Sequence, residues 1–204
     1  MAKYTKATEN VFFGDNDAIR VCNVALSYPH LLEPYAGKND KPGQGKYGAK
    51  FLIPKATGKA DALTLLNRAD KLSVDALKAK CGADNKFIRD GANSGKVDEE
   101  AFYTVSASEK TRPALIGPNG RPVEDEDVED LFYPGAIVNA LIKPWIQDNS
   151  WGKKCNANLL GVQFVKHGER LGGTRTKVED DDFEAVADFD GASGSEGFDD
   201  DNAI

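Results

Sequence analysis

Basic and aromatic residues are interleaved at several points of this sequence, in segments whose composition favours strands and loops. The candidate binding residues of this kind are Lys46, Tyr47, Lys50, Tyr103, Arg112, Lys143, Trp145, Trp151, Lys153 and Lys154. Aromatic rings stack on unpaired nucleobases, each stacked base contributing about 1 to 3 kcal/mol, while neighbouring cations follow the phosphates of one strand. The pattern therefore predicts a surface for single-stranded DNA.

Some of these aromatic residues have a purely structural alternative, because aromatic side chains are common in protein cores. We expect Phe51 to be a core residue, whereas Tyr47 and Trp145 suit either role. Trp151 lies in the polar stretch 147–152 and precedes two lysines. An indole in such a turn is expected to be part of a contact surface.

No motif of a known catalytic site is present in the sequence. Gly45-Lys46 lacks the upstream glycine of a phosphate-binding P-loop and is followed by Tyr47, and neither a GxSxG nor an HExxH motif occurs. The two histidines, His30 and His167, are 137 positions apart and offer little for general base chemistry. We therefore expect a protein that is not an enzyme.

Metal and disulfide sites are not expected either. Cys22, Cys81 and Cys155 form no CxxC zinc motif and no even set for disulfides, so we expect reduced thiols. The three aspartates at 180–182 could bind magnesium only if they were preorganised, and a solvated run of charge is the better interpretation. The sequence thus predicts no metal and no cofactor.

The C-terminal segment 179–204 carries eleven carboxylates and no lysine or arginine. The whole chain has a formal net charge of −7, whereas residues 1–178 alone carry +4. Such a segment buries too little apolar surface to offset the entropy of ordering, so we expect a disordered acidic tail. Its isolated phenylalanines and apolar end suit docking to a protein, and a purely solubilising role is the alternative. The candidate partner-binding residues are Phe183, Phe189, Phe198, Asp199, Asp200, Asp201 and Ile204.

The remaining sequence reads as strands joined by polar loops. Residues 1–17 are expected to form an N-terminal arm. Strands are predicted at 18–28 (ended by Pro29), 46–54, 102–108, within 131–145, and at 153–166, and one helix is predicted at 60–81. In 46–54, alternation places Lys46, Gly48 and Lys50 on the face opposite the apolar side chains, and the glycine leaves a flat place that a ligand or another backbone can approach.

Five to six strands with one helix inserted between the early and late strands favour a small barrel over a βαβ fold. We predict a mainly β protein, an OB-fold with a five-stranded barrel, one inserted helix and long loops over residues 18–178, followed by the tail at 179–204. No segment is long and apolar enough for a membrane helix, and the first residues lack the apolar region of a signal peptide, so we expect a soluble cytoplasmic protein.

Several short motifs occur along the chain in a recognisable order. They are LSYPHL at 26–31 with Glu33-Pro34, KYGAKFLIPK at 46–55, Ser106-Ala107-Ser108 with Arg112-Pro113, FYPG at 132–135, and GVQFVK at 161–166 with Gly168-Glu169. Together they resemble a family of phage-encoded single-stranded DNA-binding proteins, from about residue 18 to residue 185. This resemblance implies an OB-fold with an acidic C-terminal tail, and no catalysis.

Two functions follow from these observations. The first is a sequence-independent protein that covers and protects single-stranded DNA in phage replication or recombination, within the bacterial host cytoplasm. Its tail would compete with DNA and recruit replication proteins such as a DNA polymerase or a helicase/primase. The alternative is a non-catalytic scaffold whose basic face binds an acidic protein. The sequence allows a homodimer but does not determine the oligomeric state.

Overall fold

The computed structural model describes residues 4–37, 43–96 and 99–171 of the chain, and every structural statement below refers to these ranges. The strands are β1 (Tyr4–Lys6), β2 (Val11–Gly14), β3 (Ile19–Tyr35), β4 (Lys46–Pro54), β5 (Ile88–Asp90), β6 (Phe102–Glu109), β7 (Ala114–Ile116), β8 (Ile137–Asn149) and β9 (Gly152–Lys166). The α-helices are α1 (Lys59–Leu77) and α2 (Val128–Leu131), with 3₁₀ turns at Ala83–Asn85, Gly91–Ser94 and Asp125–Asp127. The mainly β class predicted from the sequence is confirmed.

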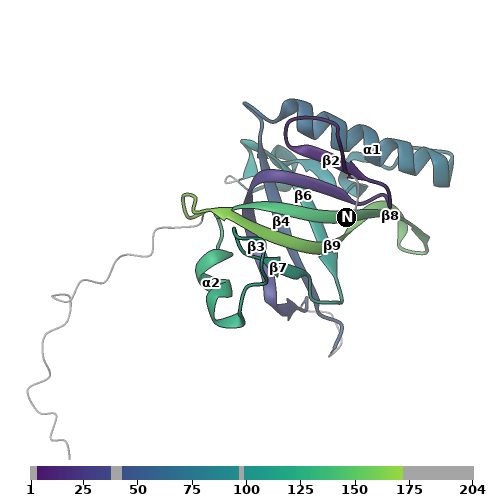
Figure 1. The fold of residues 1–204 in the computed structure, drawn as a ribbon. Helices are drawn as coiled ribbons and strands as arrows, with labels where there is room; N and C mark the ends of the chain where they lie inside the picture. Colours follow the sequence, from purple (N-terminus) through teal and green to yellow (C-terminus); the bar gives the residue numbers. More distant parts are fainter. Residues whose placement is uncertain (1–3, 38–42, 97–98, 172–204) are drawn as a thin grey trace, which may run out of the picture. The chain divides into compact units, whose positions relative to one another are not determined.

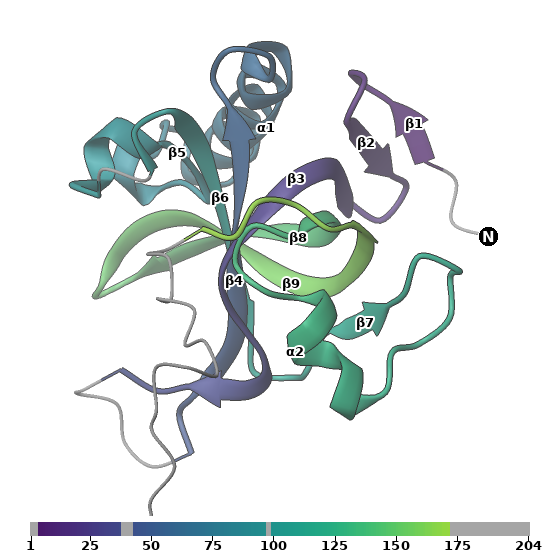
Figure 2. The same cartoon turned by 90° about the vertical axis from the view of Figure 1, so that its left-hand side faces the viewer.

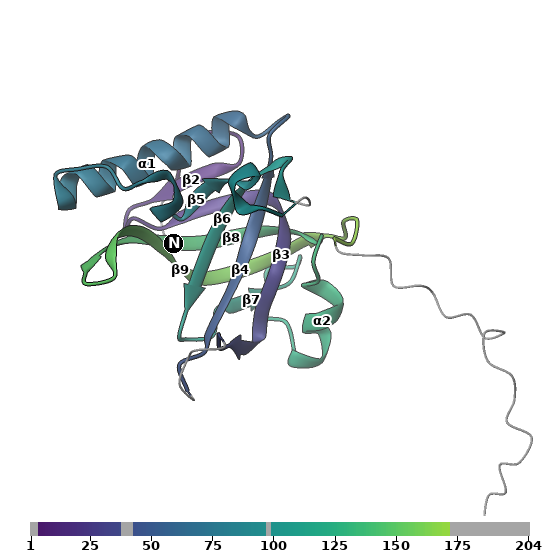
Figure 3. The same ribbon diagram turned by 180° about the vertical axis from the view of Figure 1, so that it is seen from behind.

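The nine strands of the described chain belong to one sheet, whose main order is β5-β6-β4-β3-β8-β9-β7, with β2 added to β3 and β1 added to β2. All ladders are antiparallel except the one between β7 and β9. In Figure 1, β8 and β9 run side by side and β3, β4 and β6 cross them steeply; Figure 3 shows the same crossing from behind. No ladder between described strands returns to close this path, so closure into a barrel stays a prediction, and the strand count exceeds the five that we expected.

Strand β3 is longer than the sequence analysis predicted, because Pro29 does not end it. Its register with β4 shifts between Ser27 and His30 and again between His30 and Tyr35. Proline lacks a backbone donor, and strands accept it at such bulges because the ladder there needs no N–H group. Tyr28 has a φ of 46°, which marks the first of these irregularities.

The N-terminal segment, expected to be an arm, supplies two strands to the sheet. Residues of β2 pair with the start of β3, and Val11 is completely buried. The side chains of Thr8 and Asn10 both donate hydrogen bonds to the carboxylate of Asp61 on α1. These contacts connect the first strands to the helix.

Helix α1 covers one end of the fold, while α2 and β7 lie next to each other at the opposite end (Figure 2). The buried positions of α1 include Ala62, Leu65, Ala69 and Ser73, which recur at helical spacing. The apolar spacing of this segment predicts a buried stripe along Leu63, Leu66, Val74, Leu77 and Cys81, widened by Leu65, Ala69, Leu72 and Ala76. Leu65 and Ala69 are buried as predicted, whereas Leu63 is 56% exposed. Small side chains on the buried face let the helix backbone approach the sheet closely. None of the helices in the described residues is long and apolar enough to cross a membrane.

The predicted strand at 131–145 is divided in the structure, since α2 ends at Leu131 and β8 begins only at Ile137. Gly135 lies between them with a φ of 104°, a conformation that favours glycine. A Cβ atom at this position would lie 1.9 Å from the carbonyl oxygen of Glu169. The Pro134-Gly135 turn therefore allows the chain after β9 to pack closely, and the backbone N–H of Leu171 donates to the Pro134 carbonyl at 2.9 Å.

Candidate nucleic-acid interface

A hollow of about 500 Å³ lies between β6 and the hairpin formed by β8 and β9. The hairpin contributes side chains that point to one face of its ladder, because Trp145 is opposite Asn156 and Gln147 is opposite Lys154. We call this space the hairpin hollow. The other residues that line it come from the start of β4, from β5 and its approach, from β6 and the residue after it, and from β9: Lys46, Phe87, Arg89, Ser106, Ala107, Ser108, Glu109, Lys110, Ala157 and Asn158.

A second hollow, of about 640 Å³, adjoins the first over the face of β3, β4 and β6. We call it the tyrosine hollow, since Tyr28 and Tyr35 of β3 line it together with His30. Both hollows share residues of β4 and β6 and the residue after β6, among them Lys46 and Lys110. The two hollows therefore adjoin each other, and we call them together the cleft.

The floor of the tyrosine hollow is flat because three strands meet there at a glycine. His30 of β3 is opposite Gly48 of β4, which is opposite Ser108 of β6. A Cβ atom on Gly48 would lie 3.0 Å from both the Ala107 carbonyl oxygen and the Ser108 Cβ atom. The predicted flat place on the lysine-bearing face of this strand thus coincides with the floor of the cleft.

Aromatic rings are exposed along the tyrosine hollow. Tyr35 is 57% exposed, and its ring stacks on His30 with the centroids 4.7 Å apart. Tyr28 is 42% exposed, with the ammonium groups of Lys96 and Lys50 at 3.7 Å and 5.3 Å from its ring centroid. Exposed rings beside cations are the arrangement that a stacked base and its phosphate require.

The cations of the cleft differ in their surroundings. The Lys50 ammonium lies 2.5 Å from Oε1 of Glu99, whose side chain is 1% exposed, so this lysine is held by a buried carboxylate. Lys46, Lys110 and Lys154 form no ion pair with any residue of the described ranges. These three lysines line the cleft with Arg89. They place positive charges along the cleft, where phosphates could be bound.

Four of the residues predicted from the sequence meet in this cleft: Lys46, Lys50, Trp145 and Lys154. Trp145 is 40% exposed and forms part of the hairpin hollow. Phe51, which we expected in the core, is completely buried. The alternation of β4 explains the difference, because Lys46, Gly48 and Lys50 share the cleft face and Phe51 points to the other side.

Three predicted residues lie outside the cleft lining. Tyr47 follows Lys46 but points away from the cleft, as the alternation of the strand requires. Tyr103 lies near the start of β6, and the Lys55 ammonium is 5.7 Å from its ring centroid. Arg112 forms a double hydrogen bond with Asp125, at 2.6 and 3.2 Å, and this contact raises the pKa of Arg112 and lowers the pKa of Asp125. Its charge is therefore already compensated. The interaction partners of Tyr103 and Arg112 could not be read from local sequence.

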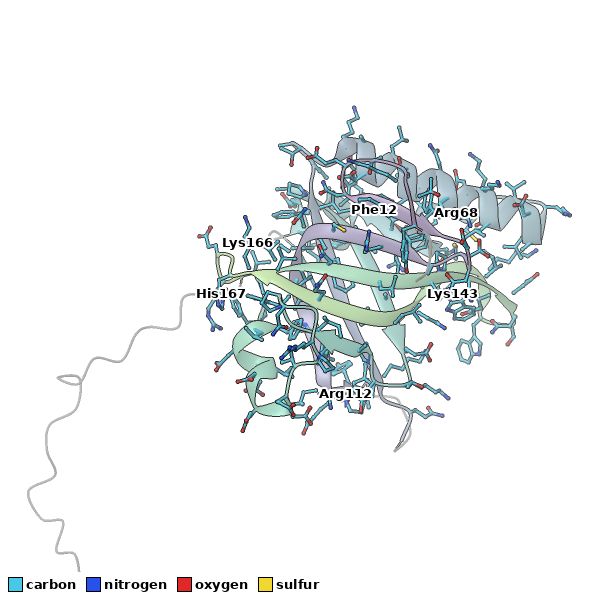
Figure 4. All side chains as sticks on the ribbon, viewed as in Figure 1. Phe12, Arg68, Arg112, Lys143, Lys166 and His167 are labelled. Carbon is cyan, nitrogen blue, oxygen red and sulfur yellow. The ribbon has the colours of Figure 1, made fainter. Side chains whose placement is uncertain are left out.

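The other three predicted residues lie on the β8–β9 hairpin but do not line the cleft. Lys143 is exposed two positions before Trp145, and Figure 4 shows it well apart from Arg112. Trp151 lies at the tip of the hairpin and is 82% exposed. Near the same tip, Nζ of Lys153 lies 3.5 Å from Oδ2 of Asp148. The indole of Trp151 is thus an exposed surface on the same hairpin as the cleft. The predicted partner-binding residues of the tail lie outside the described residues.

The cleft also contains residues that the sequence analysis did not identify. Among them are the exposed rings of Tyr28 and Tyr35, which were missed because the strand was predicted to end at Pro29. The local signal was Pro29, because a proline within a strand is found at edges or bulges. The polar side chains Asn156 and Asn158 alternate along β9, and this alternation with buried residues could have identified them.

A family model described as the ssDNA-binding protein of Enterobacter phage Enc34 matches residues 17–193 of this chain. Among solved structures, the single-stranded DNA-binding protein from bacteriophage Enc34 in complex with ssDNA is 31% identical with a TM-score of 0.76, covering 84% of this chain and 98% of that chain. Another structure of the same phage protein is 29% identical with a TM-score of 0.74, covering 89% of this chain and 98% of that chain.

A more distant likeness concerns the fold alone. Gp2.5, a single-stranded DNA binding protein encoded by bacteriophage T7, is 13% identical with a TM-score of 0.52, covering 79% of this chain and 97% of that chain. No curated protein sequence matches this chain significantly. The family match spans most of the chain, including all the strands that line the cleft. This chain therefore belongs to the family of the Enterobacter phage Enc34 ssDNA-binding protein.

Proposed function

We propose that this protein binds single-stranded DNA in the cleft formed by the tyrosine and hairpin hollows. The observation that carries the proposal is the row of exposed rings, Tyr28, Tyr35 and Trp145, along a cleft that is also lined by lysines. Bases stack on such rings whatever their identity, and the lysines neutralise phosphates. The solved complex of the Enc34 relative with ssDNA supports the same ligand for this chain.

The chemistry of the cleft supports binding without reaction. In the described residues, no group of three His, Cys, Asp or Glu side chains is placed to hold a metal ion. The relatives are DNA-binding proteins, in agreement with the expectation that this chain is not an enzyme. The lysines and rings of the cleft provide affinity and orientation, which is what covering a strand requires.

The wider role that we propose is coverage and protection of single strands during phage DNA replication or recombination. The acidic tail at 179–204 would compete with DNA for the cleft and, once displaced, recruit replication proteins such as a polymerase or a helicase/primase. The charges support this proposal, since residues 1–178 carry +4 and the tail −11. Attachment gives such a tail a high effective concentration, on the order of millimolar for a short flexible connection.

Titration of tryptophan fluorescence with oligo(dT) tests the binding proposal. A Trp151→Phe variant leaves Trp145 as the reporter in the cleft, and stacking on it should quench the emission. Equal titration with duplex of the same length should give much weaker binding. If poly-glutamate binds as tightly as oligo(dT) and quenches as much, the scaffold function with an acidic protein partner is the better interpretation.

A further inference from the structure

We propose that Asn156 and Asn158 of β9 form hydrogen bonds with the Watson–Crick edges of unpaired bases in the hairpin hollow. The protein would then require a free base edge without preferring a sequence. This inference rests on the proposed function and deepens it, because stacking rings and lysines alone recognise only base faces and phosphates. The amides would add recognition of the unpaired state itself.

The positions of the two amides follow from the β8–β9 ladder. Asn156 is opposite Trp145, and Asn158 is opposite Lys143. Both asparagines are half-buried and line the hairpin hollow, while Cys155 and Leu159 on either side of this pair are buried. A base that stacks on the indole of Trp145 would therefore have its edge next to the strand that carries the amides.

The amide of Asn156 has a defined orientation. Its Nδ2 donates to Oε1 of Gln147 at 3.1 Å, and Nε2 of Gln147 donates to Oδ1 of Asn149 at 3.1 Å. This chain of amides uses one N–H of Asn156 and leaves its Oδ1 and a second N–H for a ligand. The side-chain amide of Asn158 forms no hydrogen bond with any residue in the described part of the chain.

Amides suit every base equally well, and this explains recognition without a sequence code. A side-chain amide presents a donor beside an acceptor. Each of the four bases, when unpaired, also presents a donor beside an acceptor on its Watson–Crick edge, and a rotation of the amide matches either order. In a duplex these edges are occupied by the partner strand, so the same amides would contribute nothing to duplex binding.

Contacts to phosphate are the competing role for these amides, and the surrounding charges argue against it. Lys46, Lys110 and Lys154 line the same hollow and are stronger phosphate ligands, because charged hydrogen bonds exceed neutral ones. Neutral amides beside a stacking ring are better suited to the neutral, polar edge of a base. The two roles differ in their response to a blocked Watson–Crick edge, because only an amide that contacts the base would lose its partner.

The test compares oligo(dT) with an oligomer of N3-methylthymidine, in which the methyl group blocks the Watson–Crick edge and leaves the ring face and phosphates unchanged. We expect the parent protein to bind the methylated strand at least about 2- to 10-fold more weakly, the range for the loss of one neutral hydrogen bond. The Asn156→Ala and Asn158→Ala variants should each lose a similar factor in affinity for oligo(dT). Their affinity for the methylated strand should stay that of the parent protein. The salt slope should stay the same, because no cation is removed.

Two control variants accompany the asparagine variants. Asn67→Ala removes an exposed amide from α1, far in sequence from the hollow, and should leave both affinities unchanged. Lys154→Ala should weaken both oligomers equally and reduce the salt slope. Thermal melting of each variant shows whether it is folded.

Distinct outcomes separate the inference from the function on which it rests. Equal affinity of the parent protein for both oligomers would overturn the amide contacts, and so would asparagine variants that lose affinity equally for both. Absence of binding to either oligomer by the parent protein would instead overturn the proposed function itself.

Discussion

The Lys50 ammonium lies 2.5 Å from Oε1 of Glu99, a carboxylate that is almost completely buried. The same ammonium is 5.3 Å from the centroid of the Tyr28 ring. Lys50 was predicted to bind DNA, yet its nearest anion belongs to the protein. Glu99 therefore has a structural role, in which it holds a cation next to an exposed ring.

Replacing Glu99 with Gln should lower the free energy of unfolding by about 1.5 to 3 kcal/mol, the range for a hydrogen bond to a charged group. The reason is that Lys50 loses its counter-ion, while the neutral amide that replaces the carboxylate stays buried without an ionic partner. Urea denaturation measures the difference. Asp125→Asn, which breaks the exposed pair with Arg112, is the control and should change stability little. A fully stable Glu99→Gln protein would show that this ion pair is dispensable.

Trp145→Ala should weaken binding to oligo(dT) by about 1 to 3 kcal/mol, the contribution of one stacked base. Tyr103→Ala should not, because that ring lies outside the lining of the cleft and near Lys55. Fluorescence anisotropy of a labelled oligomer measures both at equal salt. Trp151→Ala tests the hairpin tip separately. A larger loss with Tyr103→Ala than with Trp145→Ala would place the ligand elsewhere.

The salt dependence should identify which cations contact phosphates. Lys46→Ala and Lys154→Ala should each reduce the slope of log affinity against log salt by about 0.7, the value for one phosphate contact on a single strand. Arg112→Ala should leave the slope unchanged because Asp125 already compensates its charge. The measurement is affinity for oligo(dT) across a salt series. An unchanged slope in both lysine variants would contradict the assignment of the cleft.

Thiol reactivity should follow burial. Burial raises the pKa of Cys155 from 9.0 to about 11. In the folded protein the reactive thiolate therefore forms only near pH 11, whereas in the unfolded chain the thiol ionises near pH 9. Because the unfolded chain loses this proton first, the free energy of unfolding falls as the pH rises from about 9 to about 11. Under mildly alkaline conditions, a thiol reagent should label half-buried Cys22 before Cys155, and all three cysteines only after denaturation. Mass spectrometry of labelled peptides shows the order.

Removal of residues 179–204 should strengthen binding to oligo(dT) at low salt, because eleven carboxylates that compete with DNA are lost. The gain should shrink near 0.1 M salt, where the Debye length is about 10 Å. The dissociation constants of the full chain and of residues 1–178 are measured over the same salt series. Weaker binding by the truncated protein at low salt would contradict the competition.

The sequence predicted the parts of the cleft that follow from strict alternation. Lys46–Pro54 was predicted with the bounds that the structure has, since its period of two separates Lys46, Gly48 and Lys50 from Phe51. Bulges break that period. The exposed rings of Tyr28 and Tyr35 were missed for this reason, because they depend on two register shifts in β3.

Ion pairs between distant residues were the other feature that local sequence could not supply. Arg112 is neutralised by Asp125 and Lys50 by Glu99, and neither pairing follows from spacing or composition. The buried face of α1 was predicted only in part: Leu65 and Ala69 belong to it, but Ala62, which the close approach of the helix favours, was not identified.

The hairpin hollow separates two strands that approach each other without sharing a ladder in the described part of the chain, β6 and β9. Its two walls are joined through β4, β3 and β8, so the spacing between them is set by the twist of the sheet and not by a ladder between β6 and β9. The width of the binding surface is therefore a property of the whole sheet, to which every strand between β6 and β9 contributes.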